Sequence, residues 1–361
     1  MTPRLRSDLS AIPAYVPGRN DPDAIKLASN EVTFGPLPAA LEAIAAAAAL
    51  ANRYPDNRSS ELADAIAKSL RVDPGRVLVG CGSVALCHDI VQIACDAPSD
   101  EVAMAWRSFE TYPIATRIAG ATPVQVPLTA DHVHDLAALT AAITDNTRVV
   151  FVCNPNNPTG TALGRGALER FLDAVPASVL VVLDEAYSEY LRVASDDFPD
   201  GVELGRTRPN VVVLRTFSKA YGLAGLRVGY AVGDPSVISA LSQVHVPFSV
   251  SRVAQAAALA SLRARDELLA RTDSLVAERG RVRSALLAAG YAVPPSQTNF
   301  VWLPLGERSA AYATASADAG VLIRAYGADG VRITIGEPRE NDAFLAFATA
   351  PATAAAFTDR G

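Results

Sequence analysis

The stretch VVVLRTFSKAYGLAGLR, residues 211–227, joins a short apolar run to a long polar loop. Its first four residues, Val211–Leu214, have the β-branched and apolar character of a strand that is buried on both faces of a parallel sheet. Thr216, Ser218 and Lys219 follow at the carboxyl end of that strand, which is where open α/β sheets bind their ligands. The stretch therefore predicts an α/β fold whose functional residues lie where strands end.

Similar apolar runs alternate with Ala- and Leu-rich helical stretches from residue 75 onward. This alternation is typical of a mostly parallel sheet that is covered by helices on both faces. We therefore predict one seven-stranded sheet. Its strands are expected at Val77–Val79, Val102–Trp106, Thr122–Val126, Arg148–Cys153, Val179–Leu183, Val211–Leu214 and Val228–Val232.

A second, smaller unit is predicted after residue 255. Leu262–Leu287 has the pattern of a long amphipathic helix, which Gly290 and the following prolines end. The Pro-rich first 38 residues are too few to form a domain alone, and we expect them to pack onto this unit. We predict a large domain over residues 39–255 and a small α+β domain formed by residues 1–38 and 256–361. The strands of the small domain are expected at Asn299–Leu303, Val321–Ile323 and Val331–Ile335.

Composition excludes several classes of function. The formal net charge is −6 and the isoelectric point is about 5.3, so broad attraction to nucleic acid or to anionic lipid is not expected. Met1–Ser10 is not followed by the apolar stretch of a signal peptide, and the Ala-rich tract Ala39–Ala51 is too short to span a bilayer. These features favour a soluble globular protein with small-molecule partners.

The cysteines and histidines give no sign of a disulfide scaffold or of a metal centre. The four cysteines lack the CxxC spacing, which favours a reduced, cytoplasmic protein. His132 and His134 stand between Asp131 and Asp135, and this group could bind a metal ion or could form a polar turn. We predict no metal site.

Lysine is rare in this chain, because all but three of its 32 basic residues are arginine. Lys219 is therefore a candidate for chemistry that arginine cannot perform, such as attack on a carbonyl by an unprotonated amine. The alternative is a solvated surface lysine, but that interpretation leaves Thr216, Ser218 and Arg227 unexplained. A lysine-bound cofactor beside a cluster of phosphate donors explains all of these residues together.

Three more predicted strands end in polar motifs. They are Gly80–Ser83, Asn154–Gly160 (sequence NPNNPTG) and Asp184–Tyr187 (sequence DEAY). The first resembles a dinucleotide fingerprint, but that interpretation requires an acidic residue at the end of the next strand, where this chain has Trp106 and Arg107. Backbone amides at the start of a helix suit a phosphate monoester equally well.

Together these motifs resemble the pyridoxal-phosphate (PLP) motifs of fold-type I aminotransferases. More narrowly, the chain resembles the histidinol-phosphate aminotransferase family from about Tyr15 to Phe347, and within it the actinobacterial aromatic (phenylalanine) branch. The block from Lys219 to Arg227 is the most specific part of this resemblance.

The resemblance implies a role for each residue near the cofactor ring. Lys219 would hold PLP as an internal aldimine and then move the substrate proton as a base. Asp184 would pair with the pyridine nitrogen, so that the charged ring can accept electrons. Tyr187 and Asn157 would hydrogen-bond the ring 3′ oxygen, with Asn157 also on the substrate side, and Phe109 would stack on the ring.

The resemblance also implies a phosphate site and a homodimer. The phosphate would be bound by the amides of Gly82 and Ser83, by the hydroxyls of Thr216 and Ser218, and by the guanidinium of Arg227. Tyr54 matches the family tyrosine that reaches the phosphate of the neighbouring subunit. The alternative for Tyr54 is a turn packed against its own chain.

On the substrate side, Arg332 matches the family position that binds the carboxylate. As an alternative it could be an arginine at a sheet edge, although an arginine among buried β-branched residues is costly without an anion. Arg324 would serve a distal substrate group or only a surface ion pair. Asn30 and Tyr15 are also expected to contact substrate.

Two departures from the wider family resemble the aromatic branch. The N-terminal motif reads Asn30-Glu31-Val32-Thr33 rather than Asn-Glu-Asn-Pro, and WRSF at residues 106–109 replaces the usual Pro-Thr-Tyr type of segment. Trp106, Phe34 and Tyr15 could line an apolar slot for an aromatic ring or could be core residues.

We therefore predict a PLP-dependent aminotransferase that exchanges the amino group between an aromatic L-amino acid (Phe, Tyr or Trp) and 2-oxoglutarate by a ping-pong cycle. Histidinol-phosphate transamination is the alternative that shares every cofactor contact. A PLP-dependent decarboxylase and a PLP-sensing transcription regulator are the more distant alternatives, and the second would require an added basic helix-turn-helix domain.

Overall fold

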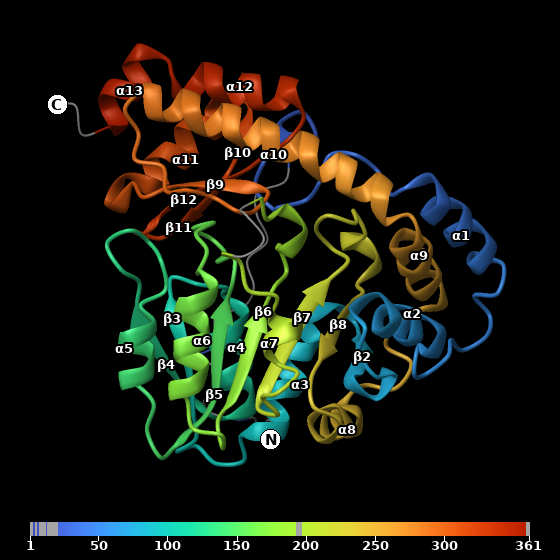
Figure 1. Cartoon of the computed structure of the whole chain (residues 1–361). Helices are drawn as coiled ribbons and strands as arrows, with labels where there is room; N and C mark the ends of the chain where they lie inside the picture. The colour runs from blue at the N-terminus through green and yellow to red at the C-terminus, as the bar shows by residue number, and fades with distance from the viewer. Residues whose placement is uncertain (1–2, 4–5, 7–11, 13–20, 193–196, 359–361) are drawn as a thin grey trace.

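The computed structural model describes residues 3, 6, 12, 21–192 and 197–358 (Figure 1). A seven-stranded sheet forms the larger part of the molecule, with the strand order β2-β8-β7-β6-β5-β3-β4. Six of these strands run parallel to one another, whereas β8 lies antiparallel to both of its neighbours. The predicted mostly parallel seven-stranded sheet is confirmed. Its strands are β2 (Val77–Gly80), β3 (Glu101–Trp106), β4 (Thr122–Pro127), β5 (Thr147–Cys153), β6 (Leu180–Asp184), β7 (Val211–Thr216) and β8 (Gly229–Val232).

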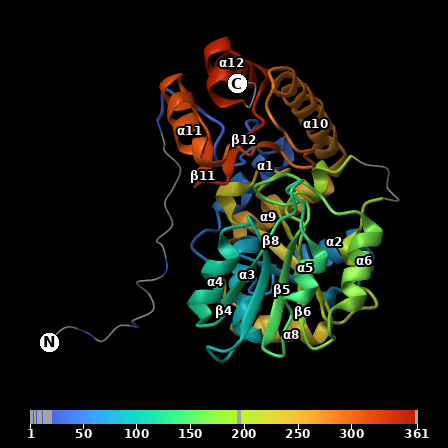
Figure 2. The same ribbon diagram turned by 90° about the vertical axis from the view of Figure 1, so that its left-hand side faces the viewer.

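Helices cover both faces of this sheet (Figure 2). Alternate side chains of a strand point to opposite faces, so Val150 and Val152 of β5 join one apolar cluster while Val149 and Phe151 join the other. The face of Phe151 is covered by α3 (Gly82–Ala94), α4 (Thr111–Ala119) and α8 (Pro235–Val244). The opposite face carries α2 (Ser60–Leu70), α5 (Leu136–Ala141), α6 (Arg165–Ala174) and α7 (Gly201–Leu204), whose apolar side chains join the cluster of Val150 and Val152.

A smaller sheet lies above the carboxyl ends of the large one (Figure 1). It has the order β11-β12-β9 and is antiparallel. The strands are β9 (Phe300–Leu303), β11 (Arg324–Tyr326) and β12 (Gly330–Thr334), with the two-residue strand β10 (Val321–Leu322) nearby. The expected strand at 321–323 does not belong to this sheet, because β10 pairs instead with β1 (Ile25–Lys26) of the N-terminal segment.

The long amphipathic helix differs from the prediction at its start. The structure has α9 (Arg252–Arg263), a break at Ala264, and then α10 (Arg265–Ala288). Figure 1 shows α10 running from the helices beside the large sheet to those above the small sheet. The domain boundaries predicted at residues 38 and 255 stay a prediction.

The remaining helices are α1 (Pro38–Ala48), α11 (Ser309–Asp318), α12 (Pro338–Ala348) and α13 (Pro351–Phe357), with short 3-10 turns η2 (Pro74–Arg76), η3 (Ser188–Tyr190), η4 (Ala224–Leu226) and η5 (Gly306–Arg308).

Within the described residues, no helix combines the length and the apolar character that crossing a membrane requires.

Candidate active site

The polar motifs predicted from the sequence meet at the carboxyl edge of the large sheet. Cys153 of β5 pairs with Asp184 of β6, and Asp184 in turn pairs with Leu214 of β7. These three neighbouring parallel strands therefore end at the same level. Their following loops carry Asn157, Tyr187 and Lys219 into one place.

A pocket of about 600 Å³ lies at this edge, between the large sheet and the small one. It brings together twelve of the predicted site residues. They are Asn30, Ser83, Phe109, Asn157, Asp184, Tyr187, Thr216, Ser218, Lys219, Arg227, Arg324 and Arg332.

The amine of Lys219 is held in an environment that favours its neutral form. Burial lowers its pKa to about 8 from an ordinary value of 10.5, with a further contribution from the nearby positive charge of Arg332. At pH 7 such a shift increases the fraction of unprotonated amine by about 300-fold. Lys219 can therefore attack a carbonyl at neutral pH, as expected of the scarce lysine in this loop.

Asp184 lies at the end of β6 and is only 2% exposed. Burial raises the pKa of its carboxyl, while the hydroxyl of Tyr112, the backbone N–H of Ala186 and the charge of Lys219 oppose that rise. Tyr112 donates to Asp184 Oδ2 at 2.6 Å, and Ala186 N donates to Oδ1 at 3.2 Å. These groups help to keep a buried carboxylate ionised, which is what pairing with a protonated ring nitrogen requires.

Tyr112 is a residue that sequence analysis missed. Its ring is fully buried, stacks on Phe151 at 4.3 Å between centroids and lies edge-on to Phe109 at 5.6 Å. The signal that could have found it is its position three residues after Phe109, because the turn that leads into α4 joins the two residues, with Tyr112 N donating to the carbonyl oxygen of Phe109 at 3.1 Å.

A cradle for an anion is formed at the start of α3. Gly82 has a left-handed φ of 77°, and a Cβ at this position would stand 2.5 Å from Arg227 Nη2. Arg227 Nη1 donates to Ser218 Oγ at 3.3 Å, and the Thr216 hydroxyl donates to the same oxygen at 3.0 Å. The guanidinium, the two hydroxyls and the helix N-terminus are together a set of phosphate donors.

Arg332 on β12 projects from the small sheet to the opposite wall of the pocket. It is 6% exposed and donates to Asn157 Oδ1 at 2.6 Å and to the carbonyl oxygen of Ala28 at 2.8 Å. Its Nε is buried and has no hydrogen-bond partner among the described residues. A buried arginine with an unused donor fits an anionic ligand such as a carboxylate.

The apolar walls of the pocket differ from the expected slot. They are formed by Phe109, Ile114, Tyr326 and Val84, none of which except Phe109 was predicted. Trp106 is not among the residues that line the pocket, and its ring packs against the guanidinium of Arg107 at 4.5 Å.

Phe34 is also outside the pocket and packs beside Arg271 at 5.5 Å. Tyr15, the third residue of the expected slot, lies outside the described residues.

Charged residues connect the two sheets at the pocket's rim. Arg324 of β11 contacts Glu110 at 3.4 Å, and Arg107, 3.7 Å from Glu110, pairs with Asp329 of the β11–β12 turn. Arg324 therefore has an ion-pair partner in addition to facing the pocket. Glu110 and Asp329 had no role in the sequence prediction.

Tyr54 does not reach the pocket of its own chain and is 80% exposed. Its ring lies 4.8 Å from that of Phe248, and Arg252 Nη2 donates to its carbonyl oxygen at 2.8 Å. His245, hydrogen-bonded to Asp89 at 2.8 Å, lies at the start of the Phe248 loop.

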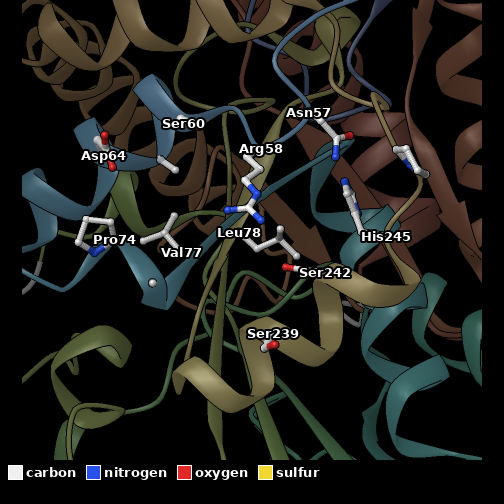
Figure 3. Close-up of a pocket in the computed structure, with 13 residues that line it drawn as sticks. Asn57, Arg58, Ser60, Asp64, Pro74, Val77, Leu78, Ser239, Ser242 and His245 are labelled. Atoms are coloured by element: carbon white, nitrogen blue, oxygen red, sulfur yellow. The ribbon is translucent and has the colours of Figure 1, made fainter.

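His245 also lines a separate cavity of about 550 Å³, together with Asn57 and Arg58 (Figure 3). The exposure of Tyr54 leaves its ring available to a neighbouring subunit, and that contact stays a prediction.

The pocket residues fit PLP, whose phosphate, ring nitrogen and aldehyde have matching partners in the cradle, in Asp184 and in Lys219. No group of three or more His, Cys, Asp or Glu side chains suited to a metal ion occurs among the residues that the structure describes. The fold and this set of residues are those of a PLP-dependent enzyme of fold type I.

Comparison with known proteins gives the family. The sequence profile described as aminotransferase class I and II matches residues 22–347. The aromatic amino acid aminotransferase of Nocardia farcinica is 68% identical over 357 residues, covering 99% of this chain and 100% of that protein. The enzyme of the same name from Rhodococcus jostii is 68% identical over 349 residues, covering 97% of this chain and 96% of that protein.

Among solved structures, the histidinol-phosphate aminotransferase of Sinorhizobium meliloti in complex with pyridoxal-5′-phosphate superposes with a TM-score of 0.88 at 32% identity, covering 99% of each chain. The chain belongs to the class I and II aminotransferase family, and its cofactor is PLP.

Proposed function

We propose that this chain transfers the amino group between an aromatic L-amino acid and 2-oxoglutarate in a ping-pong cycle. The single observation that carries the proposal is the placement of Lys219, whose amine has a lowered pKa, in a pocket that has an anion cradle at one end and Arg332 at the other. The names of the relatives at 68% identity support the aromatic substrate class.

In this proposal the residues of the chain bind and orient the reactants. When bound, PLP supplies a ring that can accept the electron pair left at the substrate Cα after its proton departs. The phosphate would be held by Gly82, Ser83, Thr216, Ser218 and Arg227, together with Tyr54 from the neighbouring subunit of a homodimer.

Around the ring, the carboxylate of Asp184 would hold the proton on the ring nitrogen, and Phe109 would supply an aromatic surface for the ring. Tyr187 and Asn157 would bind the ring oxygen. These residues line the same pocket as Lys219, whose amine would react with the cofactor aldehyde.

Lys219 then moves the proton. Its depressed pKa allows the amine to be neutral and so to accept the Cα proton near neutral pH. Arg332 binds the substrate carboxylate through the guanidinium that includes the unpartnered Nε. The ion pairs of Arg324 with Glu110 and of Arg107 with Asp329 link the two sheets at the rim of the pocket.

The side chain of an aromatic substrate would contact Phe109, Ile114 and Tyr326, which supply apolar and aromatic surface. Arg324 lies at the rim and binds the distal carboxylate of 2-oxoglutarate in the second half of the cycle. Glu110 is then its partner when no distal anion is bound.

Histidinol phosphate is a second candidate substrate, because the Sinorhizobium meliloti relative carries that name and Arg324 could bind a phosphate in place of a carboxylate. A comparison of kcat/KM for Phe, Tyr, Trp, His and histidinol phosphate with 2-oxoglutarate tests the choice. We expect the three aromatic amino acids to have the highest values. A clear preference for the phosphate ester would contradict the proposal.

A further inference from the structure

Asn30 was expected to contact the substrate, but its polar atoms form hydrogen bonds with other residues of the protein. The residue is 1% exposed and has a left-handed φ of 55°. Its backbone N–H donates to Thr334 Oγ1 at 3.0 Å, and its backbone oxygen accepts from Asn299 Nδ2 at 3.0 Å. Both partners come from the strands of the small sheet or their flanks. Asn30 is therefore fixed by the same small sheet that carries Arg332.

The hydrogen bonds of the Asn30 side chain fix which way its amide faces. The Thr334 hydroxyl accepts from the backbone N–H of Asn30 and donates its own proton to Asn30 Oδ1 at 3.2 Å. The amide nitrogen must then point the other way, where it donates to the hydroxyl oxygen of Tyr187 at 2.8 Å. An amide nitrogen can only donate, so Tyr187 is the acceptor in this bond.

The proton of Tyr187 is consequently left for another partner. The described residues include no acceptor for it, and the side chain lines the pocket beside Lys219, whose amine lies 5.9 Å from the ring centroid. Burial raises the pKa of Tyr187, so its hydroxyl keeps the proton across the working pH range. The hydroxyl can thus donate toward a ligand in the pocket.

We propose that Asn30 is a positioning residue that commits Tyr187 to donate its proton to the ring oxygen of the bound cofactor. This inference rests on the proposed function, since it assigns the partner of Tyr187 to PLP. A tyrosine hydroxyl can donate or accept, and Asn30 removes that ambiguity by occupying an acceptor position. Because Thr334 and Arg332 share β12, the strand that presents Arg332 to the substrate carboxylate also sets the polarity of Tyr187.

The substitution Asn30→Asp tests this directly, because it replaces the amide nitrogen by an oxygen of similar size. A carboxylate at residue 30 can only accept, so Tyr187 would turn its proton toward it and away from the cofactor. The readout is the pH titration of the visible absorbance of the holoenzyme without substrate. A ring oxygen that loses its donor becomes more basic and holds the neighbouring proton more tightly, so we expect the midpoint to rise by about one pH unit, a tenfold change in the equilibrium.

Two further variants separate the action through Tyr187 from the effect of a new charge. Asn299→Asp places the same change in the same buried cluster, yet Asn299 Nδ2 contacts the backbone of Asn30 and not Tyr187. We expect its midpoint to move by less than half as much. In a Tyr187→Phe background, Asn30→Asp should add almost no further shift of the midpoint.

A second measurement is the dissociation constant of PLP, followed by fluorescence. It should rise by about tenfold for Asn30→Asp and for Tyr187→Phe alike.

Two outcomes would overturn the inference: an unchanged midpoint in Asn30→Asp, or a full shift that persists in the Tyr187→Phe background. Thermal unfolding of each holoenzyme identifies a variant that does not fold. If Asn30→Asp does not fold, Asn30→Ala provides the test, and we expect a smaller rise in the midpoint. An unchanged midpoint in Asn30→Ala would contradict the role of Asn30. The wild-type holoenzyme keeps the two proposals apart. An absorbance that does not respond to any aromatic amino acid would contradict the proposed function, whereas a responsive wild type with an unshifted Asn30→Asp would contradict only the role of Asn30.

Discussion

The two ends of the pocket are built in different ways. The phosphate end takes its residues from loops at the edge of one sheet, and Thr216, Ser218 and Arg227 lie within twelve residues of sequence. The substrate end is assembled from distant segments: Asn30 is bonded to Thr334, 304 residues away, and Arg332 is bonded to Asn157, 175 residues away. The phosphate end therefore belongs to one rigid sheet, while the substrate end depends on the packing of two.

Because the two ends are built from different parts of the chain, cofactor binding and substrate binding should respond separately to substitution. A change in the cradle should alter affinity for PLP and leave the substrate KM nearly constant. A change at Arg332 of β12 should do the reverse. Lys219 and Asp184 lie between the two ends, so their substitution should affect the chemical step itself.

Lys219→Ala should have the largest effect, because it removes the amine that both attacks the cofactor aldehyde and moves the proton. We expect turnover of phenylalanine to fall by at least about 10⁴-fold. Measurement of 2-oxoglutarate-dependent turnover checks this. The matched control is Lys68→Ala, which removes an exposed lysine on α2 and should leave the rate unchanged. Comparable rates in the two variants would mean that the wrong lysine has been assigned.

Asp184→Asn should come next, since an amide cannot supply the negative charge that keeps the ring nitrogen protonated. We expect kcat to fall by about 10²- to 10³-fold with PLP still bound. Tyr112→Phe removes only the hydrogen bond that supports this carboxylate and should cost about tenfold. Rapid-mixing measurement of the absorbance change with phenylalanine checks both, and equal losses would contradict the order of roles.

Gly82→Ala should weaken the phosphate end alone. The added Cβ would stand 2.5 Å from Arg227 Nη2, so the guanidinium must move out of the cradle. The alanine would also have to adopt a positive φ, which is unfavourable for any residue with a Cβ. We expect the dissociation constant of PLP to rise by about 100-fold. Gly225→Ala in the neighbouring loop has open space around its Cβ and serves as control. A rise in the substrate KM of PLP-saturated Gly82→Ala, with PLP affinity unchanged, would break the distinction between the two ends.

Arg332→Lys should give the opposite pattern, because an ammonium group cannot reproduce the two-pronged contact of a guanidinium with a carboxylate. We expect the KM for phenylalanine to rise by about 10- to 100-fold while the affinity for PLP stays within about twofold. Steady-state kinetics and cofactor titration measure the two quantities. A loss confined to cofactor affinity would place Arg332 on the wrong side of the pocket.

The smallest effect concerns the stability of the protein without cofactor. The folded-state pKa of Lys219 is about 8, below its ordinary value of 10.5, so the unfolded chain binds more protons between these values and stability rises with pH across that window. The penalty of the buried amine is largest below pH 8, so Lys219→Met should raise the unfolding free energy by about 3 kcal/mol at pH 7. Denaturation at pH 7 and pH 10 measures the gain, which should shrink at pH 10. A gain that is equal at both pH values would contradict the pKa shift.

The phosphate end could be predicted from sequence because each of its motifs is local. An apolar run followed by Thr216, Ser218 and Lys219 specifies both the strand and what stands at its end, and the strand order brings such ends together. The large sheet followed for the same reason, since its buried strands are continuous apolar runs.

The substrate end could not be predicted in the same way. The pairing of β1 with β10 and the bonds of Asn30 depend on contacts between distant segments, which no local pattern encodes. On sequence alone Trp106 could line the pocket or belong to the core, and the structure shows that it does not line the pocket, its ring packing against Arg107. The support of Asp184 by Tyr112 was missed because a buried tyrosine is usual in a core.

Borohydride reduction of the native holoenzyme, followed by peptide mass spectrometry, tests the central assignment most directly. Reduction fixes the carbon–nitrogen bond between the cofactor and the residue that holds it. Our account predicts a phosphopyridoxyl group on the peptide that contains Lys219 and on no other. A label on Lys26 or Lys68, or an unlabelled Lys219, would contradict it.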